Sequence, residues 1–191
     1  MSWALKKIFG CMSLVESIGG WDDVQKNGMF SINLVNKKLC GVHSKVPWRR
    51  VVCNNSATPK SLFILWLVIW KRVPTLNRLI KWNIVTSDNC LLCSSSSESV
   101  EHLFFECGFT FQIWQKVLNI LQFTRSPTGF QAELDWIVKC SKKNGGRHKL
   151  LVMFFAETMY SIWLNRNDKL CNQHRKTLIE LFGDIQLKVA G

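Results

Sequence analysis

The chain has 191 residues, enough for one domain or for one domain with a helical appendage, and it carries a formal net charge of +12. Hydrophobic residues make up 47% of it, with nine Trp and twelve Phe, which excludes a globally disordered chain. The longest apolar run, residues 62–70, is about half the length that a bilayer span needs, so no membrane segment is expected.

The charge is distributed unevenly along the chain. Residues 24–87 contain eleven Lys or Arg and no acidic residue, whereas residues 82–115 contain four acidic residues and no Lys or Arg. A basic block attracts polyanions, and counterion release drives the binding. Nucleic acid is therefore one expected partner, and a cationic surface that only keeps the chain soluble is the alternative.

The first half of the chain predicts short elements. Residues 1–20 have some features of a signal peptide, but their apolar stretch is short and Glu16 interrupts it, so secretion is not expected. Residues 27–39 predict a short extended entry and then a helix from about Ile32, capped by Ser31. Residues 44–60 contain two prolines and an Asn-Asn-Ser cluster, which predict a loop around a brief strand.

The rest of the chain predicts helices. Residues 61–72 are apolar nearly all round, which predicts a buried helix. Pro74 breaks that helix and Thr75 caps the next one, on which Arg78 and Lys81 are expected to face solvent. Apolar residues at helical spacing predict further helices over residues 109–121, 134–142, 149–171 and 176–189. Since no segment alternates long enough for a multi-stranded sheet, the predicted fold class is mainly α.

Residues 90–107 hold three cysteines and one histidine with the spacing Cys-x2-Cys-x8-His-x4-Cys. Zinc prefers thiolate and imidazole ligands in a tetrahedron, and two cysteines in a Cys-x2-Cys turn can bind one ion. The pattern predicts a small, loop-borne Cys3His site in which Cys90, Cys93, His102 and Cys107 bind one Zn²⁺. The zinc is structural, because four protein ligands leave no position for a substrate or an activated water.

Three other interpretations of these cysteines fit the sequence less well. Buried free thiols do not explain two spaced pairs of ligand residues. A redox Cys-x2-Cys pair is expected between a strand and a helix, whereas a serine run follows here. Disulfides need an oxidising compartment, for which the sequence gives little support. The zinc interpretation is therefore preferred.

The remaining cysteines and acidic residues predict no second site. Cys40 with His43 and Cys171 with His174 have ligand-like spacing, but neither pair has a second pair nearby, so packed Cys and exposed His are expected. The other cysteines are expected to be structural: Cys11, Cys53 and Cys140.

Catalysis is not expected. The sequence has no zinc-deaminase or His-Glu-x2-His motif and no glycine-rich phosphate loop. The adjacent pair Asp22 and Asp23 is interpreted as a helix start or a surface feature rather than as a metal site. The chain is therefore not predicted to be an enzyme.

A longer ordered pattern surrounds the zinc spacing. Its parts are "GMFSI" at 28–32, Trp48, "PK" at 59–60, "FILW" at 63–66, "PTLNRLIKW" at 74–82, "CLLC" at 90–93, "ESVEHLFFEC" at 98–107 and Trp114. This pattern resembles the reverse-transcriptase zinc-binding domain of plant LINE-type (non-LTR) retrotransposon polyproteins, over about residues 28–120. Downstream, "IWLNRND" at 162–168 resembles a Trp-x2-Arg-Asn segment that often follows in the same polyproteins.

The resemblance implies the same four zinc ligands and implies that Trp66, Trp82 and Trp114 pack in the core around the site. Where the family often has a second Trp, this chain has Val52, which removes one packing contact. In the full polyprotein a polymerase precedes this domain and a ribonuclease H domain often follows. The chain has no Tyr-x-Asp-Asp motif and no complete ribonuclease H carboxylate cluster, so it resembles the isolated zinc region of a degenerate element or a derived gene.

These observations predict three segments: an N-terminal segment (1–27), a reverse-transcriptase-type zinc-binding domain (28–123) and a C-terminal helical tail (131–191). The expected function is non-catalytic binding of RNA or single-stranded DNA, inside the cell, with the nucleus preferred over the cytoplasm. The contacts are expected from six basic residues: Arg49, Arg50, Lys71, Arg72, Arg78 and Lys81. Lys142 and Lys143 serve as a contrast and are expected to contribute less to binding. The alternatives are a protein-interaction scaffold that packs against a polymerase or another chain, and an inactive transposon relic.

Overall fold

The computed structural model describes residues 3–41 and 44–190 and divides the chain into two compact units, Met1–Val46 and Pro47–Gly191. Both units consist mainly of helices, and the one sheet among the described residues has two short strands. The predicted mainly α fold class is therefore confirmed. Among the helices that the structure describes, none combines the length and apolar content that a bilayer span requires.

The first unit contains two helices around a hairpin. Its elements are α1 (Trp3–Ser17), the 3₁₀ turn η1 (Asp22–Val24), β1 (Gln25–Lys26), β2 (Met29–Phe30) and α2 (Ile32–Cys40). The strands pair antiparallel, and Asn27 and Gly28 between them both have positive φ, as an Asn-Gly hairpin turn requires. The Ser31 hydroxyl accepts the N–H of Leu34, which confirms the predicted cap of α2.

The acidic pair of this unit has a structural role. Asp22 and Asp23 form the first turn of η1, and Asp23 makes an ion pair with Lys38 of α2. Lys38 also donates to the carbonyl of Ile18, at 3.0 Å. The interpretation of the pair as a helix start and surface feature is confirmed.

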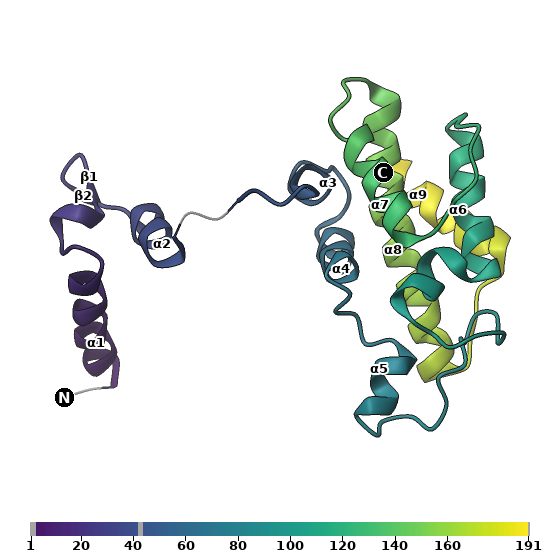
Figure 1. Cartoon of the computed structure of the whole chain (residues 1–191), viewed down its shortest axis with the longest axis horizontal. Helices are drawn as coiled ribbons and strands as arrows, with labels where there is room; N and C mark the ends of the chain where they lie inside the picture. The colour runs from purple at the N-terminus through teal and green to yellow at the C-terminus, as the bar shows by residue number, and fades with distance from the viewer. Residues whose placement is uncertain (1–2, 42–43, 191) are drawn as a thin grey trace. The chain divides into compact units, whose positions relative to one another are not determined.

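The second unit is a helical assembly around one long helix, α8 (Gly146–Asn172) (Figure 1). Its other elements are α3 (Arg49–Cys53), α4 (Pro59–Ile69), α5 (Leu76–Lys81), the π-helical turn η2 (His102–Glu106), α6 (Gly108–Ile120), α7 (Phe130–Cys140) and α9 (Leu178–Ala190). Helix α8 packs against α4, α6, α7 and α9. At the centre of the core, the ring of Phe155 on α8 lies 5.4 Å from that of Trp114 and 6.1 Å from that of Phe105.

Helix α4 is buried on one face only. Thr58 caps it by accepting the N–H of Ser61, and Glu157 of α8 accepts the Thr58 N–H at 2.8 Å and the Ser61 hydroxyl at 2.7 Å. Leu65 is buried on the same face, whereas Phe63 is 58% exposed. Trp66 and Trp70 are also exposed. The prediction of a wholly buried helix was therefore wrong for the aromatic face of α4.

The predicted strand within residues 44–60 was also wrong, because Arg49–Cys53 form the short helix α3. Val51 is fully buried, and α3 packs against α4 and α7. The Asn55 side chain donates to the carbonyls of Val51, at 3.0 Å, and of Val152 on α8, at 2.9 Å. Tertiary packing thus outweighs the strand preference of two adjacent β-branched residues.

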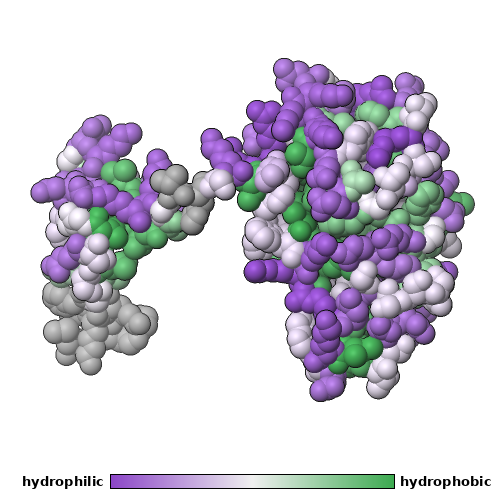
Figure 2. All heavy atoms as spheres, viewed as in Figure 1, coloured by the Kyte–Doolittle hydropathy of each residue, from purple (hydrophilic) through white to green (hydrophobic). Residues whose placement is uncertain are grey.

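The remaining helices lie close to their predicted ranges, and α7 and α8 begin four and three residues earlier than expected. The boundaries of the three predicted segments stay a prediction, since the two compact units divide the chain at a different point, between Val46 and Pro47. Hydrophilic residues cover much of the viewed face of the second unit, with hydrophobic areas between them (Figure 2).

Candidate functional site

The four predicted zinc ligands lie on a short folded loop and on the turn that follows it. The N–H of Glu98 donates to Asp88, at 2.7 Å, and the N–H of Cys90 donates to Ser96, at 2.8 Å, so the serine run folds back over Cys90. Ser94 closes the Cys-x2-Cys turn by donating its N–H to Cys90, with φ of +58°. This turn directs both sulfurs of the motif toward the same point.

The second ligand pair is presented by η2 and the start of α6. The N–H of Cys107 donates to the carbonyl of His102, at 2.7 Å, across the π-helical turn. Cys107 is also the N-cap residue of α6, and the hydroxyl of Ser99 accepts the N–H of His102, at 3.0 Å. The histidine and the third cysteine are therefore positioned by backbone hydrogen bonds rather than by loop residues alone.

The donor atoms of the four side chains all lie within 4.8 Å of one another. The Cys90 and Cys107 sulfurs are 3.9 Å apart, and the Cys93 sulfur is 3.2 Å from His102 Nε2. A tetrahedron with Zn–S bonds of about 2.3 Å and Zn–N bonds of about 2.05 Å has edges of roughly 3.8 Å and 3.6 Å. The donor set and its spacing therefore fit one zinc ion.

The hydrogen bond between the two buried thiols shifts their pKa values in opposite directions. A hydrogen bond from Cys90 is the largest cause that lowers the pKa of the Cys107 thiol, to about 5, and the backbone N–H groups of Thr110 and Phe109 lower it further. The same hydrogen bond and burial raise the pKa of Cys90. A thiolate at the N-terminus of α6 is the form that a metal requires.

Disulfides do not account for the cluster. The sulfurs of Cys90 and Cys107 are nearly twice as far apart as a disulfide bond of about 2.05 Å allows, and every cysteine in the described residues is free.

Two arginines, one on α8 and one in the connection between α8 and α9, hold residues 88–98, called the zinc loop below, in place. Arg175 donates to the carbonyl of Leu92, inside the Cys-x2-Cys turn, at 2.5 Å. Arg166 of α8 donates its Nε to Glu98 at 2.9 Å, and both side chains are almost fully buried. Glu98 Oε1 also accepts the N–H of Leu76 at the start of α5. The loop, α5 and α8 therefore meet at one buried ion pair, which the sequence did not predict.

The other cysteine and histidine residues form no metal group in the part of the chain that the structure describes. His174 pairs with Asp168 at 2.8 Å and, like Cys171, is exposed. Cys40 is exposed too, so the expectation that Cys40 and Cys171 are packed in the interior was wrong. His43 lies outside the described residues. Of the cysteines expected to be structural, Cys140 is buried but Cys11 and Cys53 are exposed, so that expectation was wrong for these two.

The three tryptophans expected around the site differ in burial. Trp114 is fully buried and donates its Nε1–H to Glu133 at 2.8 Å, as core packing requires. Trp66 and Trp82 are exposed, so the expectation that they pack in the core was wrong. Trp66 lies on the outer face of α4 and Trp82 directly follows α5.

The six predicted basic residues lie on or beside α3, α4 and α5, which follow one another along one side of the second unit (Figure 1). Arg49 and Arg50 are exposed. Lys71 makes an ion pair with Glu101, at 2.5 Å. Arg72 is exposed beside the Trp70 ring, 5.8 Å from its centre.

The prediction that Arg78 and Lys81 face solvent is confirmed for Lys81 and wrong for Arg78. Arg78 is half-buried because its guanidinium donates to the carbonyl of Lys71, at 2.9 Å, in the turn between α4 and α5. The same guanidinium lies 5.3 Å from the centre of the Trp82 ring. Arg78 therefore stabilises the turn as well as contributing charge.

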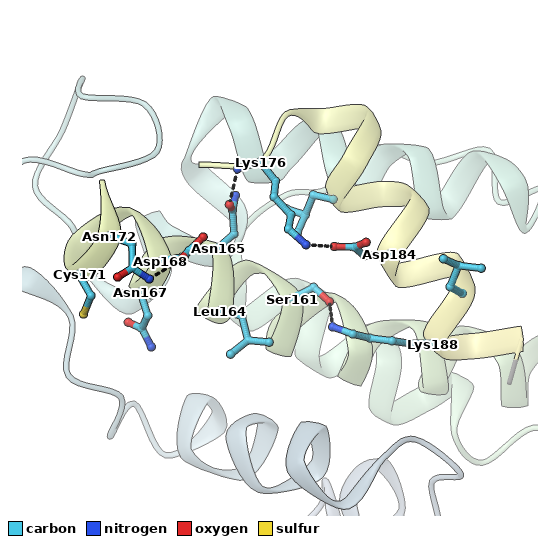
Figure 3. A pocket seen from close by; sticks show the side chains of 12 residues that line it. Ser161, Leu164, Asn165, Asn167, Asp168, Cys171, Asn172, Lys176, Asp184 and Lys188 are labelled. Atoms are coloured by element: carbon cyan, nitrogen blue, oxygen red, sulfur yellow. Dashed lines mark hydrogen bonds and ion pairs between the residues drawn. The ribbon is translucent and has the colours of Figure 1, made fainter. Parts of the chain in front are cut away.

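A hollow of about 720 Å³ lies between α8 and α9 (Figure 3). Most of its polar groups bond to one another: Lys176 pairs with Asp184 at 2.5 Å, and Lys188 donates to Ser161 at 2.9 Å. Burial lowers the pKa of Lys188. Because the lining holds both acidic and basic side chains, it does not favour one chemical class of ligand.

One comparison with known proteins gave a match. Residues 30–114 match the family model described as zinc-binding in reverse transcriptase, which is less than half of the chain. The matched segment contains all four candidate zinc ligands. No curated protein and no solved structure matches the chain. The similarity is therefore to the zinc-binding part of reverse transcriptases, and no catalytic domain is matched.

Proposed function

We propose that the chain is a non-catalytic, zinc-stabilised nucleic-acid-binding module derived from the zinc-binding region of a plant LINE-type reverse transcriptase. The family match and the gathered Cys3His donor set support the zinc part of the proposal. Cys90, Cys93, His102 and Cys107 would hold the ion, which would crosslink the loop to η2 and the start of α6. A closed set of four protein ligands supplies stability and no reactive position.

The zinc loop also positions the surface that we assign to nucleic acid. Glu98, within the loop, accepts the N–H of Leu76 through its side chain at 3.0 Å and that of Asn77 through its carbonyl at 3.3 Å. Both donors belong to the first turn of α5. A loop that is ordered by zinc therefore fixes the helix that carries Arg78 and Lys81.

The observation that carries the nucleic-acid part is two exposed tryptophans beside α4 and α5, each next to an arginine. Trp70 is 48% exposed and lies beside Arg72, and Trp82 is 54% exposed and lies beside Arg78. Proteins bind single-stranded nucleic acid by stacking bases on exposed aromatic rings while nearby cations contact the phosphates. RNA or single-stranded DNA is therefore the proposed partner, and we propose an intracellular, preferably nuclear, location.

The test uses the double variant Arg72→Gln with Lys81→Gln, which removes two exposed charges and leaves the Arg78 hydrogen bonds intact. Two lost phosphate contacts should lower the salt slope of single-stranded RNA binding by about 1.4 and the affinity at 150 mM salt by roughly tenfold. Fluorescence anisotropy over a salt series measures both quantities. The matched control, Lys139→Gln with Lys142→Gln, removes two other exposed charges and should change little.

The runner-up function is a protein-interaction scaffold, for a polymerase or another chain, and the exposed Phe63 and Ile84 favour it. An apolar interface should respond weakly to salt, unlike phosphate contacts. Equal loss of affinity in the variant and the control would contradict the localised surface. If wild-type protein binds no nucleic acid at low salt, the proposed nucleic-acid binding is wrong, and the remaining interpretations are a protein-interaction scaffold and an inactive relic.

A further inference from the structure

A second hollow, of about 450 Å³, lies where α3, α7 and α8 meet. One wall is Arg50 with the turn 54–56 after α3, and another is formed at the end of α7 and just after it by Cys140, Ser141, Lys143 and Asn144. The third wall comes from the first turns of α8, residues 148–152. Three segments far apart in sequence therefore form one concave surface.

The hollow has a fixed frame. The Asn55 amide group bonds the carbonyls of Val51 and Val152, which ties α3 to α8 across the hollow. The Asn55 carbonyl oxygen accepts the N–H of Ala57, at 3.1 Å, so the polar atoms of this side chain are all engaged. The floor of the hollow is thus held by hydrogen bonds within the protein, and other groups remain for a ligand.

Those other groups are cationic. Arg50, Lys143 and Lys149 line the hollow together with His148, and no Asp or Glu does. None of the three cations makes a salt bridge in the part of the chain that the structure describes, whereas Lys38, Lys71 and Lys176 each pair with a carboxylate. Like charges that converge without a counter-charge raise the local potential, and a bound anion relieves their repulsion.

The chemistry of the lining favours phosphate. Arg and Lys are the side chains that bind phosphate oxygens, and the asparagine and serine groups around them offer further polar contacts. The helix that carries Arg50 also lies beside the proposed nucleic-acid surface, because the ring of Trp48, the residue before α3, packs edge to face with that of Trp70 at 5.9 Å between the ring centres.

We infer that this hollow binds a phosphate group of the nucleic-acid strand, so that Arg50, Lys143 and Lys149 anchor a strand whose bases stack on the Trp–Arg surface. The inference rests on the proposed function for the source of the phosphate. It also changes the role of Lys143, which was expected to be a contrast to the binding residues and instead lies beside one of them.

The experiment compares two double variants of the full chain. Lys143→Gln with Lys149→Gln removes two charges from the hollow, and Lys139→Gln with Lys142→Gln removes two exposed charges outside its lining. The first should bind single-stranded RNA roughly tenfold more weakly at 150 mM salt, with a slope lower by about 1.4, and the second should bind like wild type. If the first variant binds RNA as wild type does, the inference is overturned and the proposed function stands, because the Trp–Arg surface is intact. Equal weakening in both variants also overturns the inference.

Two further arms identify the source of the phosphate. If an RNA with a 5′-phosphate binds wild type better than the same RNA with a 5′-hydroxyl, and the hollow variant loses this difference, the ligand is a terminal monoester. If the two RNAs bind alike and the hollow variant weakens both, the ligand is a backbone diester.

If wild type binds no strand, the proposed function fails and inorganic phosphate becomes the probe. A melting temperature that phosphate raises in wild type but not in the hollow variant then supports a phosphate site, and equal responses overturn it.

Discussion

Cys107 is both a candidate zinc ligand and the N-cap residue of a helix. It follows η2, caps α6, and has its thiol pKa lowered to about 5, chiefly by the hydrogen bond from Cys90. A residue on both elements transmits any change at the donor set into the core helix α6. The metal site and the packing around Trp114 are therefore physically connected.

The first prediction concerns the metal. Purified protein should contain about one zinc per chain, and Cys93→Ser should lose it, because a hydroxyl is a poor ligand beside two thiolates and an imidazole. Cys93 is only half-buried, so the substitution itself disturbs little packing. Elemental analysis gives the zinc content, and thermal melting should show a lower midpoint in the variant.

The control is Cys53→Ser, at an exposed thiol outside the donor set. It should retain zinc and melt like wild type. Equal zinc contents in the two variants would show that the four residues are not the ligands.

The second prediction concerns the buried pair of Glu98 and Arg166. Arg166→Met should lower the free energy of unfolding by about 3–5 kcal/mol, since it leaves a buried carboxylate without its counter-charge. The double variant Glu98→Gln with Arg166→Met should recover part of this loss. Chemical denaturation measures the effect, and Arg49→Met, at an exposed site, should stay within about 0.5 kcal/mol of wild type. A small loss for Arg166→Met would mean that the pair does not order the zinc loop.

At the scale of elements, the features that depend only on neighbouring residues could be predicted from the sequence. Ser31 as the cap of α2 and the helical spacing from Phe109 onward each depend on neighbouring residues, and the structure confirms both. Helix α4 already ends at Ile69, before the predicted break at Pro74, and Thr75 is the N-cap residue of α5 without a capping hydrogen bond from its side chain. The zinc donor set was also predictable, because its spacing lies within eighteen residues of sequence.

What the sequence could not predict depends on contacts between distant segments. The apolar run of α4 does not reveal which face α8 covers, so the exposure of Trp66 was missed. The pair of Glu98 and Arg166 spans 68 residues, and the basic hollow combines three separate segments. A weak signal did exist for Arg166, since it occupies the Arg of the Trp-x2-Arg-Asn segment noted in the sequence.

At the scale of the whole molecule, the matched segment and the folded unit have different limits. The match ends at Trp114, but the rings that Trp114 and Phe105 contact include Phe155 on α8. Leu65 and Val68 of α4 are likewise buried on the face that α8 covers. A core shared with α8 cannot form from the matched segment alone.

The last prediction follows from this shared core. A fragment of residues 47–191 should fold cooperatively and bind zinc, because it contains a complete core of its own. A fragment of residues 30–114 should lack a cooperative melt even with zinc, since α4 and η2 would expose the large apolar side chains that α8 covers. Circular dichroism melts and binding of a hydrophobic dye compare the two fragments at equal zinc. A sharp melt of the shorter fragment, with no dye binding, would show that the zinc-binding segment folds without α7, α8 and α9.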